Sequence, residues 1–161
     1  MTFMFIAAAT PACAVDLLYV GLGNSTIATF DTSSGVSTTI AASKATFAST
    51  PNIPMGLAFD ASGKLYAANS PANILKFNST GGLAGTIGNS SNLNNRIGLA
   101  FDASGNLYAS NSSNDIITKF DASGQFVGYI GSSSNLNNPQ GIAFDYNGNL
   151  LDRKSTRLNS S

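Results

Sequence analysis

The chain has 161 residues, no net charge and only 10% charged residues, and it contains no His, no Trp and no Glu. This length gives room for one ordinary domain. Because there is no basic excess, we predict no nucleic-acid partner, and no apolar run approaches the roughly 20 residues of a membrane-spanning helix.

The N-terminal segment has features of an export signal. An apolar run over Phe3–Ala9 is followed by Ala12-Cys13-Ala14, an Ala-x-Ala cleavage pattern. We therefore predict that residues 1–14 are a signal-peptide remnant and that the mature protein is extracytoplasmic, either secreted or periplasmic. The alternative is a buried strand of an earlier repeat. Cleavage after Ala14 would remove the only cysteine, so the sequence predicts no disulfide framework.

Three segments of the chain are copies of one pattern. They read PMGLAFDASGKLYAANS from Pro54, RIGLAFDASGNLYASNS from Arg96 and PQGIAFDYNGNLL from Pro139. An earlier, looser copy begins at Leu17. Equivalent glycines fall 42 and then 43 residues apart, at Gly56, Gly98 and Gly141. A period in this range is the mark of a repeat architecture.

Each copy reads as four short strands. In the copy that begins at Pro54, the pattern predicts strands over residues 56–60, 64–70, 74–78 and 82–88. The sequence DASG closes the first hairpin, where Asp60 can accept backbone N–H groups and Gly63 can adopt a positive φ. No part of these copies carries a helical period. Four antiparallel strands in about 40–45 residues are typical of a propeller blade.

The sequence therefore predicts an all-β fold, a partial β-propeller that forms an open arc. Two blades are complete, over 54–88 and 96–131, and two are partial, over about 17–50 and 139–151. The first strand of each blade carries Gly and Ala on one face, which lets neighbouring blades approach. On its other face lie Phe59, Phe101 and Phe144, which we expect to fill the gap to the next blade, each contributing roughly 1.5–3 kcal/mol.

The segments PMGLAFDASGKLYAANSPANILKFN and PQGIAFDYNGNL resemble NHL repeats, and the resemblance covers about residues 17–151. It implies a β-propeller, usually six-bladed. The style of the sequence also resembles the NHL-type propellers of exported bacterial proteins. Three features depart from the family pattern. Asn69 and Asn111 stand where the family often has Asp, the Asn-Arg before the third strand is missing, and Arg96 replaces the usual Pro.

The last ten residues, DRKSTRLNSS, resemble no part of a blade. They look like a translated sequencing-library adapter, so we predict that residues 152–161 are not natural protein. The alternative is a genuine basic tail.

Catalysis finds little support in the composition. There is no His or Glu to act as a base, and Asp60, Asp102 and Asp145 recur in the hairpins, where a turn role is favoured. DASG lacks the alternating Asp spacing of a calcium loop. We predict no catalytic residue, no metal site and no cofactor in these blades.

The remaining candidate is a binding surface formed by polar loops such as SSNLNN, NSPAN and NSSND. We predict a non-catalytic exported module or scaffold that binds a protein or carbohydrate ligand through Asn69, Arg96, Asn111 and Asp115. For each of these residues taken singly, a solvated loop residue that binds no ligand is the favoured alternative. One alternative is a fragment of a propeller-type metal-dependent hydrolase or lyase whose active-site residues lie in missing blades. A cytoplasmic RNA-binding NHL module is the third hypothesis, and the scarcity of basic residues argues against it.

Overall fold

The computed structural model describes residues 5–8, 17–31, 44–69, 73–94 and 98–152. The described residues form strands, turns and irregular segments, and none of them is helical. The strands form antiparallel sheets in which neighbours in sequence are neighbours in space. Short polar turns between amphipathic strands favour this meander, because each strand can pair at once with the one before it.

Each sheet is one blade. The first blade contains β1 (Phe5–Ala8), β2 (Leu17–Leu22), β3 (Thr26–Asp31) and β4 (Lys44–Ser49). The second contains β5 (Pro54–Phe59), β6 (Leu65–Asn69), β7 (Asn73–Phe77) and β8 (Leu83–Ile87). The third contains β9 (Leu99–Phe101), β10 (Leu107–Asn111), β11 (Ile116–Phe120) and β12 (Phe126–Ile130). The fourth is the pair β13 (Ile142–Phe144) and β14 (Leu150–Asp152).

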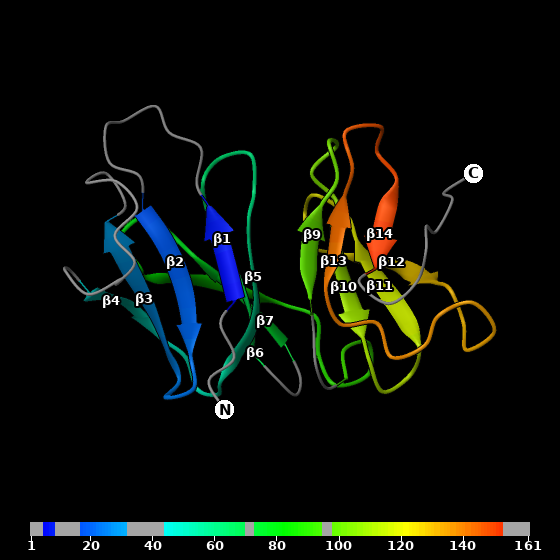
Figure 1. The fold of residues 1–161 in the computed structure, drawn as a ribbon, viewed down its shortest axis with the longest axis horizontal. Helices are drawn as coiled ribbons and strands as arrows, with labels where there is room; N and C mark the ends of the chain where they lie inside the picture. Colours follow the sequence, from blue (N-terminus) through cyan, green and yellow to red (C-terminus); the bar gives the residue numbers. More distant parts are fainter. Residues whose placement is uncertain (1–4, 9–16, 32–43, 70–72, 95–97, 153–161) are drawn as a thin grey trace, which may run out of the picture.

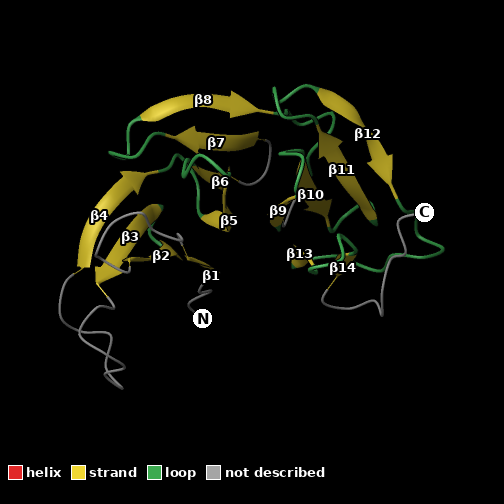
Figure 2. Ribbon diagram, turned by 90° about the horizontal axis from the view of Figure 1, so that it is seen from above, coloured by secondary structure: helices red, strands yellow, loops and turns green. Residues whose placement is uncertain are grey.

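The four blades follow one another around an open arc (Figure 1). Figure 2 shows the first strand of each blade on the inner side of the arc and the fourth strands on the outer side. The predicted all-β fold and the arc of four-stranded antiparallel blades are therefore confirmed. Strand bounds in the second blade agree with the predicted ones to within a few residues.

Hydrophobic cores lie between the blades. Between the second and third blades, the buried side chains of Tyr66 and Ile74 pack against those of Leu99, Leu107 and Phe120. Equivalent clusters join the first blade to the second and the third to the fourth. One sheet cannot bury both of its faces alone, so the order of each blade depends on its neighbours.

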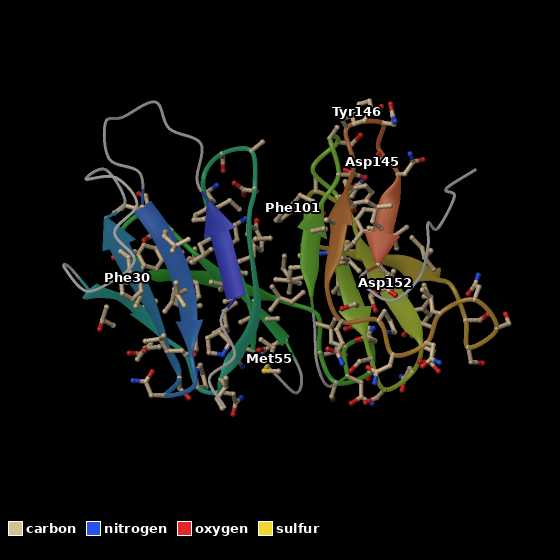
Figure 3. All side chains as sticks on the ribbon, in the orientation of Figure 1. Phe30, Met55, Phe101, Asp145, Tyr146 and Asp152 are labelled. Carbon is tan, nitrogen blue, oxygen red and sulfur yellow. The ribbon has the colours of Figure 1, made fainter. Side chains whose placement is uncertain are left out.

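An edge-to-face aromatic pair recurs at each junction between blades. The pairs are Tyr19–Phe59, Tyr66–Phe101 and Tyr108–Phe144, with ring centroids 4.9 Å apart in all three. Such pairs add roughly 0.5–1.5 kcal/mol beyond the burial of their area. Each Phe thus fills the gap to the preceding blade, and the prediction that it faces the next blade was wrong. Figure 3 shows Phe101 in the space between the second and third sheets.

Small residues on the inner strands do let the blades approach closely, as predicted. A Cβ atom on Gly98 would overlap the backbone carbonyl oxygen of Gln140, which leads into the fourth blade. Gly63, in the first hairpin of the second blade, has a φ of 78°, which fits the positive φ expected there.

Both ends of the described chain bear on the sequence predictions. Phe5–Ala8, within the predicted signal-peptide remnant, pairs with β2 and gives the first blade a fourth strand. The segment is therefore a strand, as the alternative had it, but it belongs to the first blade and not to an earlier one. Cleavage after Ala14 stays a prediction. At the other end, Asp152 is the last residue of β14 and pairs with Ile142 of β13. The remainder of the predicted non-native tail, 153–161, lies outside the described residues.

Candidate functional site

Where the structure describes them, the connections between blades share one face of the arc with the connections between second and third strands. We call this the loop face, and it lies at the bottom of Figure 1. The described hairpins between first and second strands, in the second, third and fourth blades, lie on the opposite face, here called the hairpin face. Tyr146 marks the tip of one such hairpin in Figure 3, whereas Met55 lies at the loop-face end of β5.

Asn69 and Asn111 end the second strands of their blades, and each binds the connection that enters its own blade. The backbone N–H of Asn52 donates to Oδ1 of Asn69 over 2.9 Å. The backbone N–H of Asn94 donates to Oδ1 of Asn111 over 2.8 Å. Both bonds join residues 17 apart in sequence, so the repeat encodes the same contact twice.

The Asn111 carboxamide makes further hydrogen bonds. Its Nδ2 donates to the carbonyl oxygen of Asn92 over 3.2 Å and to the hydroxyl of Thr118. The Thr118 hydroxyl in turn donates to the same Asn92 carbonyl over 2.7 Å. Asn111 is only 1% exposed. A side chain this buried and this fully bonded fixes the path of the connection.

A buried leucine anchors the same connections from within. Leu93 and Leu136 are the single apolar residues of the two SSNLNN segments, yet they are 1% and 2% exposed. Leu93 joins the core between the second and third blades, and Leu136 joins the next core. The sequence analysis described these segments as polar loops and gave neither leucine a role. Their recurrence at the same place in two copies was the available signal.

Asp115 lies at the joint between the third and fourth blades. Its Oδ1 accepts the backbone N–H of Asn138 over 2.6 Å. Both residues have a positive φ, 54° and 51°, which Asp and Asn tolerate better than most side chains. Beside them, the Ser110 hydroxyl donates to the carbonyl oxygen of Gln140 over 2.9 Å. Hydrogen bonds from the side chains of Asp115 and Ser110 therefore link the third blade to the fourth on the loop face.

The four predicted binding residues do not form one compact group. Asn111 ends β10 and Asp115 lies on the connection from β10 to β11, whereas Asn69 belongs to the second blade. Arg96 falls outside the described residues. The polar atoms of Asn69 bind Asn52 and also Asn73, so this carboxamide holds its loop as Asn111 does.

The hairpin face carries the repeated carboxylates, and they cap the turns as predicted. Oδ1 of Asp60 accepts the backbone N–H groups of Ser62 and Lys64, at 2.9 and 3.0 Å. Burial alone would raise the pKa of Asp60, but hydrogen bonds from Ser62, Lys64 and Tyr66 outweigh it and hold the pKa below its ordinary value. With its pKa held low, the Asp60 carboxylate is ionised at neutral pH and does not suit a role as a general acid.

The same balance holds the pKa of Asp102 below its ordinary value, with burial opposed by hydrogen bonds from Asn106, Tyr108 and Ser104. In the part of the chain that the structure describes, no three His, Cys, Asp or Glu side chains gather closely enough to hold a metal ion. Among the same residues there is no helix with the length and apolar character needed to cross a membrane.

These features define a β-propeller arc with inter-blade joints tied on the loop face. No family model matches the chain, and no curated protein matches it. Among solved structures, Myxococcus xanthus glutaminyl cyclase is similar with a TM-score of 0.61 at 18% identity, over 92% of this chain and 67% of that one. Apo AztD from Citrobacter koseri is similar with a TM-score of 0.58 at 14% identity, over 85% of this chain and 35% of that one. At these identities the likeness shows the fold alone.

Proposed function

We propose that the chain is part of an exported, non-catalytic NHL-type propeller that binds a protein or carbohydrate ligand on its loop face. The supporting observation is the repeated tie between the end of a second strand and the connection that enters its blade, made by Asn69 and again by Asn111. Loops held by buried side chains lose little conformational entropy when a ligand binds.

The chemistry of the loop face suits a polar ligand. The connections that enter the third and fourth blades expose serine hydroxyls and asparagine amides. These groups can donate and accept hydrogen bonds, as sugar hydroxyls and peptide backbones require. In this proposal Arg96 and Asp115 contact the ligand, while Asn69 and Asn111 act as positioning residues that fix the loops.

The alternative function is that of a propeller-type enzyme, a metal-dependent hydrolase or lyase. The observation that favours this alternative is that one of the similar structures is named as an enzyme, glutaminyl cyclase. The carboxylates of the hairpin face give it no support, because Oδ1 of Asp60, Asp102 and Asp145 each caps its own turn and, among the described residues, no three such carboxylates gather around one point. Loop-face binding therefore remains the better supported proposal.

The test is a glycan and peptide array probed with the full chain, followed by titration of any ligand found. Asp115→Asn keeps the acceptor for the Asn138 N–H but removes the charge, and Arg96→Ala removes the cation. Each is expected to weaken binding about tenfold, the cost of one charge-assisted hydrogen bond. Tyr146→Ala is the matched control, because Tyr146 is 96% exposed on the opposite face. Equal loss in the control, or turnover of substrate on adding divalent metal, would contradict the proposal.

A further inference from the structure

A cavity of about 190 Å³ lies between the second and third blades on the hairpin face. It is separate from the loop face, so a ligand bound in it is independent of the function proposed for that face. The turn after β5 and the turn after β11 form its rim, and side chains from β6, β8, β9 and β10 form its walls.

The walls of the cavity are apolar and aromatic. Tyr66 and Phe101 meet edge to face with centroids 4.9 Å apart, and both line the cavity. Ile87 and Leu107 complete the walls. The ring faces of Tyr and Phe attract cations, and the aliphatic surface suits a short hydrocarbon stem.

The charged residues that line the cavity are both acidic, Asp60 and Asp121. The hydrogen bond from the Ser123 hydroxyl, with the backbone bond from Gln125, holds the pKa of Asp121 below its ordinary value. In the described part of the chain, the side-chain bonds of Asp121 all end on Oδ1, which leaves Oδ2 for a ligand. The ammonium of Lys76 lies 5.2 Å from the centre of the Tyr66 ring and offsets part of this negative charge.

The junction between the first and second blades differs in the residue of the turn and in the aromatic rings that pack there. There Asn78 takes the turn position of Asp121, and its Oδ1 accepts the N–H groups of Thr80 and Gly82 in the same way. That turn is neutral. At the same junction the ring of Phe47 packs against Tyr19 and Phe77, with centroids 5.1 and 6.3 Å away. At the second junction, the Asp121 carboxylate lies at the rim of the cavity; among the described residues of the first junction, the corresponding turn residue is the neutral Asn78.

We propose that this cavity binds a small organic cation, a primary ammonium or guanidinium group on a short apolar stem. The stem, of about four methylenes as in a lysine side chain, lies against Tyr66, Phe101 and Ile87. The cation lies at the rim between Asp60 and Asp121. The group can belong to a free amine or to a lysine or arginine side chain of a partner protein, because the recognised chemistry is the same.

The experiment titrates the isotope-labelled full chain with n-butylammonium and follows backbone amide shifts by NMR. We expect saturable shifts at Ala61, Ser62 and Ala122, which line the cavity, that weaken as salt is added. Neutral n-butanol is the uncharged comparison. A second arm uses Nα-acetyl-lysine amide in place of the free amine: tighter binding indicates a partner's side chain as the source, and weaker binding a free amine.

Two variants and one control decide the outcome. Asp121→Asn reproduces the turn that Asn78 already makes, so it should fold normally and weaken n-butylammonium binding about threefold. Ile87→Phe, with folding checked by circular dichroism, should fill the cavity and abolish the shifts. Asp102→Asn changes the same turn position as Asp60, in the next blade and outside the cavity, and should leave affinity unchanged. Equal shifts with n-butanol, or the same affinity in all variants, would overturn the proposal.

Discussion

Replacing Asn111 with alanine tests how firmly the loop face is fixed. The substitution removes the acceptor for the Asn94 N–H at 2.8 Å and the donor to the Asn92 carbonyl at 3.2 Å. Thr118 still donates to that carbonyl. The main group left without a hydrogen-bond partner is therefore the Asn94 N–H. Leaving one such group without a partner costs about 1–3 kcal/mol, and the space left by the buried side chain adds to this.

We therefore expect Asn111→Ala to lower the free energy of unfolding by about 2–3 kcal/mol, or the melting temperature by about 5–10 °C for a chain of this size. Thermal and urea unfolding followed by circular dichroism would measure it. Asn114→Ala is the matched control, because Asn114 is exposed on the same connection, and its cost should stay within about 0.5 kcal/mol. If the two variants melt together, the Asn111 carboxamide does not hold the loop and the reasoning fails.

Three further predictions concern the joints and the turns. Leu93→Ala should cost about 2–5 kcal/mol in urea unfolding because it opens a cavity in an inter-blade core; a cost below about 1 kcal/mol would show that the loop does not need its anchor. Gly98→Ala should push the fourth blade from the third, since its Cβ overlaps the Gln140 carbonyl, and hydrogen exchange would report faster exchange in β13. The pKa values of Asp60 and Asp102 are lowered on folding, so the stability they contribute is present above the unfolded value of about 3.9 and is lost as pH falls through the folded values. Unfolding should therefore begin below about pH 4 in an acid titration, and a double Asp→Asn variant that shows the same acid transition would refute this.

The blades could be predicted because their information is local and repeated. The alternating strands and the DASG turns each specify structure within a few residues. The period near 42 shows that three copies carry the same local pattern. The capping role of Asp60 follows from the turn alone. The same local signals placed Gly98 at a close approach between blades.

What the sequence could not show depends on contacts between distant residues. Asn111 stands out in the sequence because it departs from the NHL pattern that the repeats resemble, but its bond to Asn94 spans the whole first hairpin of the blade. Leu93 was hidden in a polar loop because composition was averaged over the segment. Whether Phe101 faces the preceding or the following blade depends on how the sheets pack together. The residue pattern of a single strand does not contain this information.

The cavity between the second and third blades was beyond sequence reasoning for the same reason. Asp60 and Asp121 belong to different blades and to different turns, and only the stacking brings them to one rim. Once the stacking is known, the repeats can be compared turn by turn. Asn78 makes the same turn as Asp121 without a charge.

The most direct test of the stacked-blade arc is a measurement of proton–proton contacts between aromatic rings by NMR in the full chain. The account predicts nuclear Overhauser effects between the rings of Tyr66 and Phe101 and between those of Tyr108 and Phe144, whose centroids lie 4.9 Å apart. Strong intra-blade contacts without any between these rings would show blades that form but do not lean on one another, and would contradict it.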